Sequence, residues 1–449
     1  QEVIMDASLK SDHPTENTAQ PLSRPPSQPP SQPPSQTPSR PAWVDGWLED
    51  YRAVLVESWS PFLGATLIVL VIMALMASGL FWGVFGGLKL WGDYLNTWLG
   101  LGALLGISAE LDNPLLHRIS IMNMVLVLGA FSAAVVSGQF RINRPPPLEY
   151  VWGALGGTLM GIGAALAGGC TVGGFFTPVL ISSPVGWVMW IGLMAGAAIG
   201  VKVMLWALDH IEWGTEAPTP VSMQAVKPYL PWVGLGIAAL VAFWAADWFV
   251  SPDKKLAARA IIVVAGFALG FILQRSRFCF ARVIREPLMT GEGEMTKAMI
   301  FAIGLGIPFG ALLISLKLAD PYSAIPAAFW LGSLLGGLVF GVGMILAGGC
   351  ASGSLWRMGE GHLKLWVAAF FFAWSGSIAS GVLKKFGLSR VDFDIDFLDG
   401  TPEITALGYQ AFLPDLAGWG WAYGLGIGVL ALWYAAVRYN ESTDRFTLF

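Results

Sequence analysis

The chain alternates long apolar runs with short polar connections over most of its length. A helix needs about 20 apolar residues to cross a bilayer. Runs that reach or approach this length lie at 61–86, 119–138, 151–169, 183–206, 231–250, 260–274, 298–318, 326–347, 363–383 and 417–438. The segment 95–108 is apolar but short, which suits a re-entrant or interfacial piece. The pattern predicts an all-α polytopic membrane protein with about nine or ten spans.

Two of the apolar runs are copies of each other. The run that begins at Gly332 is rich in small residues and stops at Gly348, Gly349 and Cys350. The earlier copy stops in the same way at Gly168, Gly169 and Cys170. Such a repeat indicates a membrane protein built from two related halves, each with a Gly-Gly-Cys loop that re-enters the membrane. The halves are inverted if 95–108 and 260–274 both cross, and parallel if both only re-enter.

The composition divides the chain into segments. Residues 1–49 are polar, and Pro-Pro-Ser-Gln occurs three times there, which predicts a disordered tail. The remaining predicted segments are a first membrane repeat (50–210), a linker (211–230), a second repeat (231–385), a loop (386–416), an extra C-terminal helix (417–438) and a tail (439–449).

The overall composition agrees with a membrane location. Hydrophobic residues make up 55% of the chain and charged residues 12%, whereas soluble domains carry about 25% charged residues. Tryptophans near the ends of the runs are interpreted as interfacial anchors. These are Trp59, Trp82, Trp91, Trp98, Trp187, Trp190, Trp206, Trp213, Trp232, Trp248 and Trp433.

Several functional classes find no support in the sequence. No basic run points to nucleic acid. Three separated cysteines without a CxxC pair, and four scattered histidines, argue against a disulfide framework or a metal site. No nucleotide-binding motif or catalytic set stands out, so no cofactor and no enzymatic activity is predicted, although persulfide transfer stays possible.

Loop charge gives a predicted orientation. Basic residues cluster at Arg141 and Arg144, between Arg275 and Lys297, and at Arg357 and Lys364. With ten crossings all three clusters fall on the cytoplasmic side of a bacterial inner membrane, and both termini are cytoplasmic. The segment 254–259, which carries two lysines and an arginine, then lies outside, against the rule.

A helix break at membrane depth needs a reason. Irregular backbone survives there only beside protein or water, and the N–H groups at a new helix start attract anions. Thr171, Ser352 and Ser354 follow the two breaks and are candidate hydroxyl donors. The alternative is a pair of kinked helices that carry nothing.

The thiols point to the chemistry of the cargo. A thiol is soft and polarisable, which suits a sulfur or selenium anion or a transferable sulfane sulfur. Passage of an intact anion requires protonated thiols, because a thiolate would repel it. Persulfide chemistry instead requires the thiolate. Inert buried thiols are the plain alternative.

The third cysteine, Cys279, lies in a basic and aromatic stretch. Arg275 and Arg277 precede it, and two more arginines follow it. These residues could gather anions at a pore mouth, or they could only form a positive loop on the cytoplasmic side. The segment 108–118 of the first half has neither a cysteine nor an arginine cluster, so the predicted pathway is asymmetric.

Together, the paired Ala-Gly-Gly-Cys stretches, Arg-Phe-Cys-Phe around Cys279 and the Leu-Trp-Arg-Met-Gly-Glu-Gly stretch from Leu355 resemble the YeeE/YedE family of sulfur-transport membrane proteins over roughly 75–385. The resemblance implies inverted halves and cysteines lined up along a narrow path for thiosulfate or a related species. It also implies a TusA-like sulfur-carrier protein as a cytoplasmic partner, with the basic 275–297 loop as the docking or exit surface.

The leading interpretation is a permease for thiosulfate or a similar inorganic sulfur anion. The alternatives are a transporter of a selenium species, a membrane sulfurtransferase that carries a persulfide, and a structural subunit of a larger assembly. The predicted substrate-binding or relay residues are Cys170, Cys279, Cys350, Gly168, Gly169, Thr171, Gly348, Gly349, Ser352, Arg275 and Arg277.

Overall fold

The computed structural model describes residues 52–211, 229–388 and 404–448. The tail predicted at 1–49, nearly all of the predicted linker and part of the loop predicted at 386–416 lie outside these residues.

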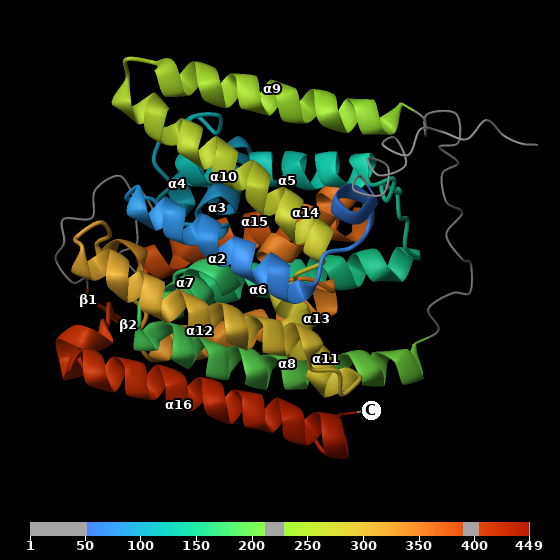
Figure 1. The fold of residues 1–449 in the computed structure, drawn as a ribbon, viewed down its shortest axis with the longest axis vertical. Coiled ribbons are helices and arrows are strands. Elements are labelled where there is room, and N and C mark those ends of the chain that lie inside the picture. Colours follow the sequence, from blue (N-terminus) through green and yellow to red (C-terminus); the bar gives the residue numbers. More distant parts are fainter. Residues whose placement is uncertain (1–51, 212–228, 389–403, 449) are drawn as a thin grey trace, which may run out of the picture. The chain divides into compact units, whose positions relative to one another are not determined.

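The described residues are mostly helical (Figure 1). The helices are η1 (Arg52–Val56), α2 (Pro61–Ala77), α3 (Phe85–Trp98), α4 (Gly102–Leu105), α5 (Arg118–Val136), α6 (Pro147–Ala167), η2 (Thr171–Phe176), α7 (Thr177–Leu180), α8 (Pro184–His210), α9 (Leu230–Val250), α10 (Lys254–Ser276), α11 (Phe280–Met289), α12 (Glu294–Ser315), η3 (Pro321–Ala324), α13 (Leu331–Ala347), α14 (Ala351–Glu360), α15 (Leu363–Lys385) and α16 (Leu413–Thr443). Two short strands, β1 (Ile404–Thr405) and β2 (Gly408–Tyr409), pair antiparallel.

Within the described residues, nine helical stretches are long and apolar enough to cross a membrane. The apolar helix α2 is shorter, with 17 residues. The chain is therefore an all-α, multi-pass membrane protein, as its hydropathy pattern predicted. Three of the nine stretches consist of two helical parts in series: Pro147–Leu180, Lys254–Met289 and Leu331–Glu360. Each of the three is interrupted at a cysteine.

The expected apolar run 61–86 is not a single helix. Helix α2 ends at Ala77, and the chain passes through a turn before α3 begins at Phe85. Trp82 lies in this turn and is fully buried, so its interpretation as an interfacial anchor is wrong. Trp98 and Trp232 fit that interpretation better, because 81% and 73% of their surfaces are exposed.

Close glycine contacts join α6 to α13. A Cβ atom on Gly163 of α6 would fall 2.5 Å from the backbone nitrogen of Phe340. A Cβ atom on Gly343 of α13 would fall 2.7 Å from the backbone oxygen of Gly156. Only glycine lets two helix backbones approach this closely. The two glycines occupy matching positions in the two copies of the repeat, so each copy makes the same contact with the other.

The loops with the basic clusters meet at one end of the helices. The backbone N–H of Asn143, after α5, donates to Gly361, after α14, at 2.9 Å. The side chain of Gln274, at the end of α10, donates to Gln139 at 2.9 Å. The N–H of Leu448 donates to Leu288 of α11 at 2.8 Å. We call this end, formed by 137–147, 275–297, 357–364 and 437–448, the arginine-rich end.

The opposite end collects the remaining connections. The Ser183 hydroxyl, before α8, donates to the carbonyl of Ala411 at 2.6 Å. The Tyr322 hydroxyl donates to the Asp415 carboxylate at 2.7 Å. The basic clusters of the sequence therefore share one end of the molecule, whereas the cytoplasmic assignment of that end stays a prediction.

Candidate functional site

Two helices end at matching glycines. Gly168 ends α6 with φ +68°, and Gly348 ends α13 with φ +83°. Residues with a side chain rarely adopt this left-handed conformation, so glycine is the expected helix terminator. The next helical segment then starts directly after Cys170 in one copy and after Cys350 in the other. Each break thus places a cysteine at the first position before a new helix.

The backbone beyond each break is also matched. Cys170 and Cys350 are both extended, with ψ values of −173° and 179°. The carbonyl of Cys170 accepts from the N–H of Gly174 at 2.7 Å, and the carbonyl of Cys350 accepts from the N–H of Ser354 at the same distance. The carbonyls are therefore satisfied within the new helical turns, and the thiols remain available for other contacts.

The third cysteine has a similar local setting. Helix α10 ends at Ser276, and Arg277 adopts a left-handed conformation with φ +55°. Cys279 is extended and directly precedes α11. All three cysteines are free thiols, and none exposes more than 1% of its surface.

Cys279 and Cys350 lie together although they are far apart in sequence. Both sulfurs border the space beside Gly353. A Cβ atom on Gly353 would lie 2.8 Å from the sulfur of Cys279 and 3.1 Å from that of Cys350. The N–H of Gly353 donates to the Cys350 sulfur at 3.3 Å, and the Ser352 hydroxyl lies 3.5 Å from it. The absence of a side chain at Gly353 leaves the space in which the two sulfurs meet.

Two buried hydroxyls near the cysteines have no hydrogen-bond partner among the described residues. They belong to Thr171, next to Cys170, and to Ser354, in the first turn after Cys350. A buried polar group without a partner costs about 1–3 kcal/mol. A bound anion would accept hydrogen bonds from these hydroxyls and would remove that cost.

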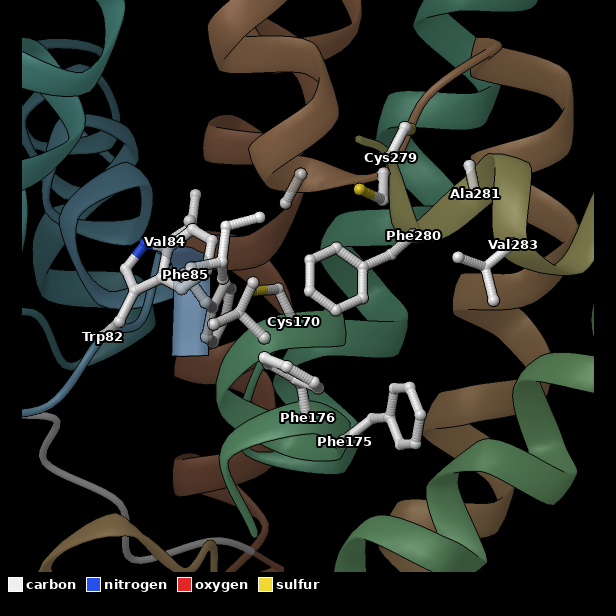
Figure 2. Close-up of a cluster of buried hydrophobic side chains, with 14 of the residues drawn as sticks. Trp82, Val84, Phe85, Cys170, Phe175, Phe176, Cys279, Phe280, Ala281 and Val283 are labelled. Atoms are coloured by element: carbon white, nitrogen blue, oxygen red, sulfur yellow. The ribbon is translucent and has the colours of Figure 1, made fainter. Parts of the chain in front are cut away.

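Buried aromatic rings form a cluster near Cys170. The Phe280 side chain extends from the start of α11 toward Cys170 (Figure 2). Its ring contacts that of Phe176 edge-to-face at 5.3 Å between centroids, and Trp82 lies 6.5 Å away. All three rings are buried. The three buried rings therefore fill the space beside Cys170 in the conformation described.

The two arginines predicted to gather anions have partners within the protein. The guanidinium of Arg275 is buried and donates to the backbone carbonyl of Glu57. Arg277 forms an ion pair with Glu360 at 2.9 Å and donates to Gln139 at 3.0 Å. Arg277 lies at the arginine-rich end with 39% of its side chain exposed. Anion binding by either residue stays a prediction.

Some residues of the site were missed by sequence reasoning. Gly353 matches Gly173 in the repeat, and this correspondence could have marked it as special. The ring of Phe280 belongs to the Arg-Phe-Cys-Phe stretch, but no sequence signal says that it points toward Cys170. In the part of the chain that the structure describes, no three His, Cys, Asp or Glu side chains are grouped to hold a metal ion.

Comparison with known proteins places this site in a family. The chain matches the sulphur transport family over residues 25–199 and 275–443, which include all three cysteines. It is 26% identical to the probable transporter YedE of Escherichia coli (strain K12) over 329 residues, which cover 71% of this chain and 80% of that protein.

Shorter matches are more similar. The thiosulfate transporters TsuA of Escherichia coli (strain K12) and of Spirochaeta thermophila are each 37% identical to the chain. These alignments cover 24% of this chain, and 31% and 33% of the two relatives. The chain belongs to the sulphur transport, or YeeE/YedE, family.

Proposed function

We propose that this protein is a permease that takes up thiosulfate, or a related inorganic sulfur or selenium anion, across the bacterial inner membrane. Membership of the sulphur transport family and similarity to TsuA support this substrate class. The observation that carries the proposal is the buried pair of free thiols, Cys279 and Cys350, at a helix break with the unsatisfied hydroxyl of Ser354.

The chemistry of these donors fits a soft anion that has lost its water. An anion inside a membrane needs hydrogen-bond donors to replace its hydration shell. Thiol groups supply weak and polarisable donors, which match sulfur better than they match a hard oxyanion. The hydroxyls of Ser352 and Ser354 and the start of α14 add further donors beside Cys350. Protonated thiols let the anion pass without covalent change.

We further propose that the two halves are inverted and that the path is asymmetric. The reciprocal contacts of Gly163 and Gly343 support a two-fold relation between the copies. The proposed route runs from the opposite end past Cys170 and the aromatic cluster to Cys279 and Cys350. It leaves at the arginine-rich end, where a TusA-like carrier would receive the sulfur species in the cytoplasm.

Transport is tested with purified protein in proteoliposomes. Labelled thiosulfate on one side should enter, and excess unlabelled thiosulfate should compete more strongly than sulfate, with sulfite and selenite tested in parallel. Empty liposomes supply the background. A protein that inserts correctly but carries none of these anions would remove the proposal.

The paired thiols also favour a second candidate, a membrane sulfurtransferase. Cys279 and Cys350 border the same space beside Gly353. The thiolate of either residue could attack the outer sulfur of thiosulfate, break its S–S bond, keep that sulfur as a persulfide and release sulfite. Mass spectrometry after incubation with labelled thiosulfate separates the two functions. A stable added sulfur on one cysteine supports the transferase, and unmodified thiols with transmembrane flux support the permease.

A separate prediction concerns the aromatic cluster. Phe280→Ala opens the space between Cys170 and the pair, so we expect weaker discrimination between thiosulfate and sulfate, by about tenfold in relative uptake. Because loss of a buried phenylalanine costs about 3–5 kcal/mol, Phe280→Leu serves as a milder variant. Phe370→Ala is the control, since Phe370 is half exposed on α15. If both Phe280 variants discriminate between thiosulfate and sulfate as well as the wild type does, the aromatic cluster is not a barrier to the anion.

A further inference from the structure

Two adjoining cavities open at the arginine-rich end. The first has a volume of about 340 Å³, and its lining includes Gly348, Arg357 and Lys364. The second has a volume of about 490 Å³, and its lining includes Arg141, Arg144, Arg277 and Glu360. Asn143 and His362 line both cavities. We call the two cavities together the arginine vestibule.

The vestibule carries more positive than negative side chains. Five arginines and lysines line it against two carboxylates, those of Glu149 and Glu360. Both carboxylates are engaged, with Lys364 at 2.7 Å and with Arg277 at 2.9 Å. Among the described residues, no ion pair is formed by the other three cations, which are Arg141, Arg144 and Arg357. The uncompensated charge favours an anion in this space.

Arg357 connects the vestibule to the thiol pair. It lies on α14, the helix that starts directly after Cys350. Its Nη1 atom donates to the carbonyl of Gly348 at 2.8 Å, and Gly348 is part of the wall of the first cavity. Gly349 alone separates Gly348 from Cys350 in the chain. The lining of the first cavity therefore reaches the backbone turn that carries Cys350.

The matching turn of the first copy lacks this charge. At the repeat offset, Thr177 corresponds to Arg357 and Pro184 to Lys364. A Cβ atom on Gly168 would contact the ring of Pro326. A Cβ atom on the matching Gly348 would instead have Nζ of Lys364 as its nearest neighbour, at 3.9 Å. The positive charge of the vestibule is therefore not a property of the repeat, and it is present at only one end of the proposed path.

We propose that the arginine vestibule is a binding site for a small inorganic oxyanion such as thiosulfate or sulfate, and that Arg357 passes the anion between this site and Cys350. The binding site stands on the cavities and their charge. The role of Arg357 in passage rests on the proposed function.

The first experiment measures the electrostatics of the vestibule without transport. Asn143→Cys places an exposed thiol in both cavities, whereas the native thiols are buried. Ser442→Cys supplies a matched exposed thiol at the same end, on α16. The modification rates with an anionic and a cationic methanethiosulfonate reagent are compared, and wild-type protein gives the background.

We expect the ratio of anionic to cationic modification rates to be about tenfold higher at position 143 than at position 442. Arg357→Gln should lower the ratio at 143 several-fold, and Arg357→Lys should retain it. Added sulfate should slow modification at 143 but not at 442. The proposed anion site would be refuted by equal ratios of anionic to cationic modification rates at positions 143 and 442. It would also be refuted if Arg357→Gln left the ratio at 143 unchanged.

The second experiment tests the route. In protein with its native cysteines, Arg357→Gln should reduce thiosulfate flux about tenfold, and Arg438→Gln on the same end should not. A fall in the rate ratio with full transport would overturn the role of Arg357 in passage. If the wild-type protein carries no sulfur anion while the rate ratio and the sulfate protection hold, the proposed function fails and the anion site stands.

Discussion

Cys350→Ala is expected to reduce thiosulfate uptake at least about tenfold while the protein still folds and inserts. The substitution removes a thiol donor at the start of α14 and the sulfur that borders the same space as that of Cys279. A hydrogen bond to a charged group contributes about 1.5–3 kcal/mol, so the rate should fall between about tenfold and a hundredfold or more. Uptake of labelled thiosulfate into proteoliposomes measures the effect, with protein amount and thermal stability in detergent determined on the same preparation.

Cys350→Ser separates donor loss from loss of sulfur. A hydroxyl can still donate, so its uptake should lie between those of the alanine variant and the wild type. Cys170→Ala should reduce uptake by a similar factor if the anion passes both breaks. Wild-type uptake by Cys350→Ala would show that this thiol does not touch the cargo.

The second large effect is expected from Gly353→Ala. The new methyl group would fall 2.8 Å from the sulfur of Cys279 and 3.1 Å from that of Cys350, so at least one thiol must move. A displacement of about 1 Å at a reacting or binding centre can cost about a hundredfold in rate. We therefore expect uptake to fall by about that factor, although alanine stabilises a helix by about 0.8–1 kcal/mol relative to glycine.

A second glycine supplies the control for this prediction. Gly428 lies in α16, where a Cβ atom would meet nothing within 4 Å. Gly428→Ala should leave uptake close to that of the wild type, and it should not lower stability. If Gly353→Ala transports normally, the space between the two sulfurs is not needed for passage.

Much of the architecture could be predicted from the sequence. The apolar runs and the small-residue repeat predicted a helical membrane protein, and the helices and the family match confirm that class. The Gly-Gly-Cys copies also marked where α6 and α13 end, because glycine in a left-handed conformation is a local signal. Local chemistry of this kind can be read along the chain.

The meeting of Cys279 with Cys350 could not be predicted, because it depends on how α10 and α11 pack against α14. The positions of Trp82 and Arg275 were hidden for a related reason. A tryptophan near the end of an apolar run can lie at the interface or in the interior, and only packing decides between the two. For an arginine before a cysteine, too, only packing decides the contacts: Arg275 is buried and donates to the carbonyl of Glu57, and its Nε and Nη1 atoms have no hydrogen-bond partner among the described residues.

The glycine contacts between α6 and α13 limit how the protein can move. Their backbones touch at matched points of the two copies, without side chains that could slide or repack. Rocking one half against the other would separate this seam and expose its tightly fitted surfaces. If instead only the side chains of the aromatic cluster and the cysteines rotate to admit the anion, the contact between α6 and α13 stays intact. For the proposed permease, this seam favours a fixed frame through which the anion passes in small steps, as in a channel with an internal filter. It disfavours a carrier whose two halves tilt alternately.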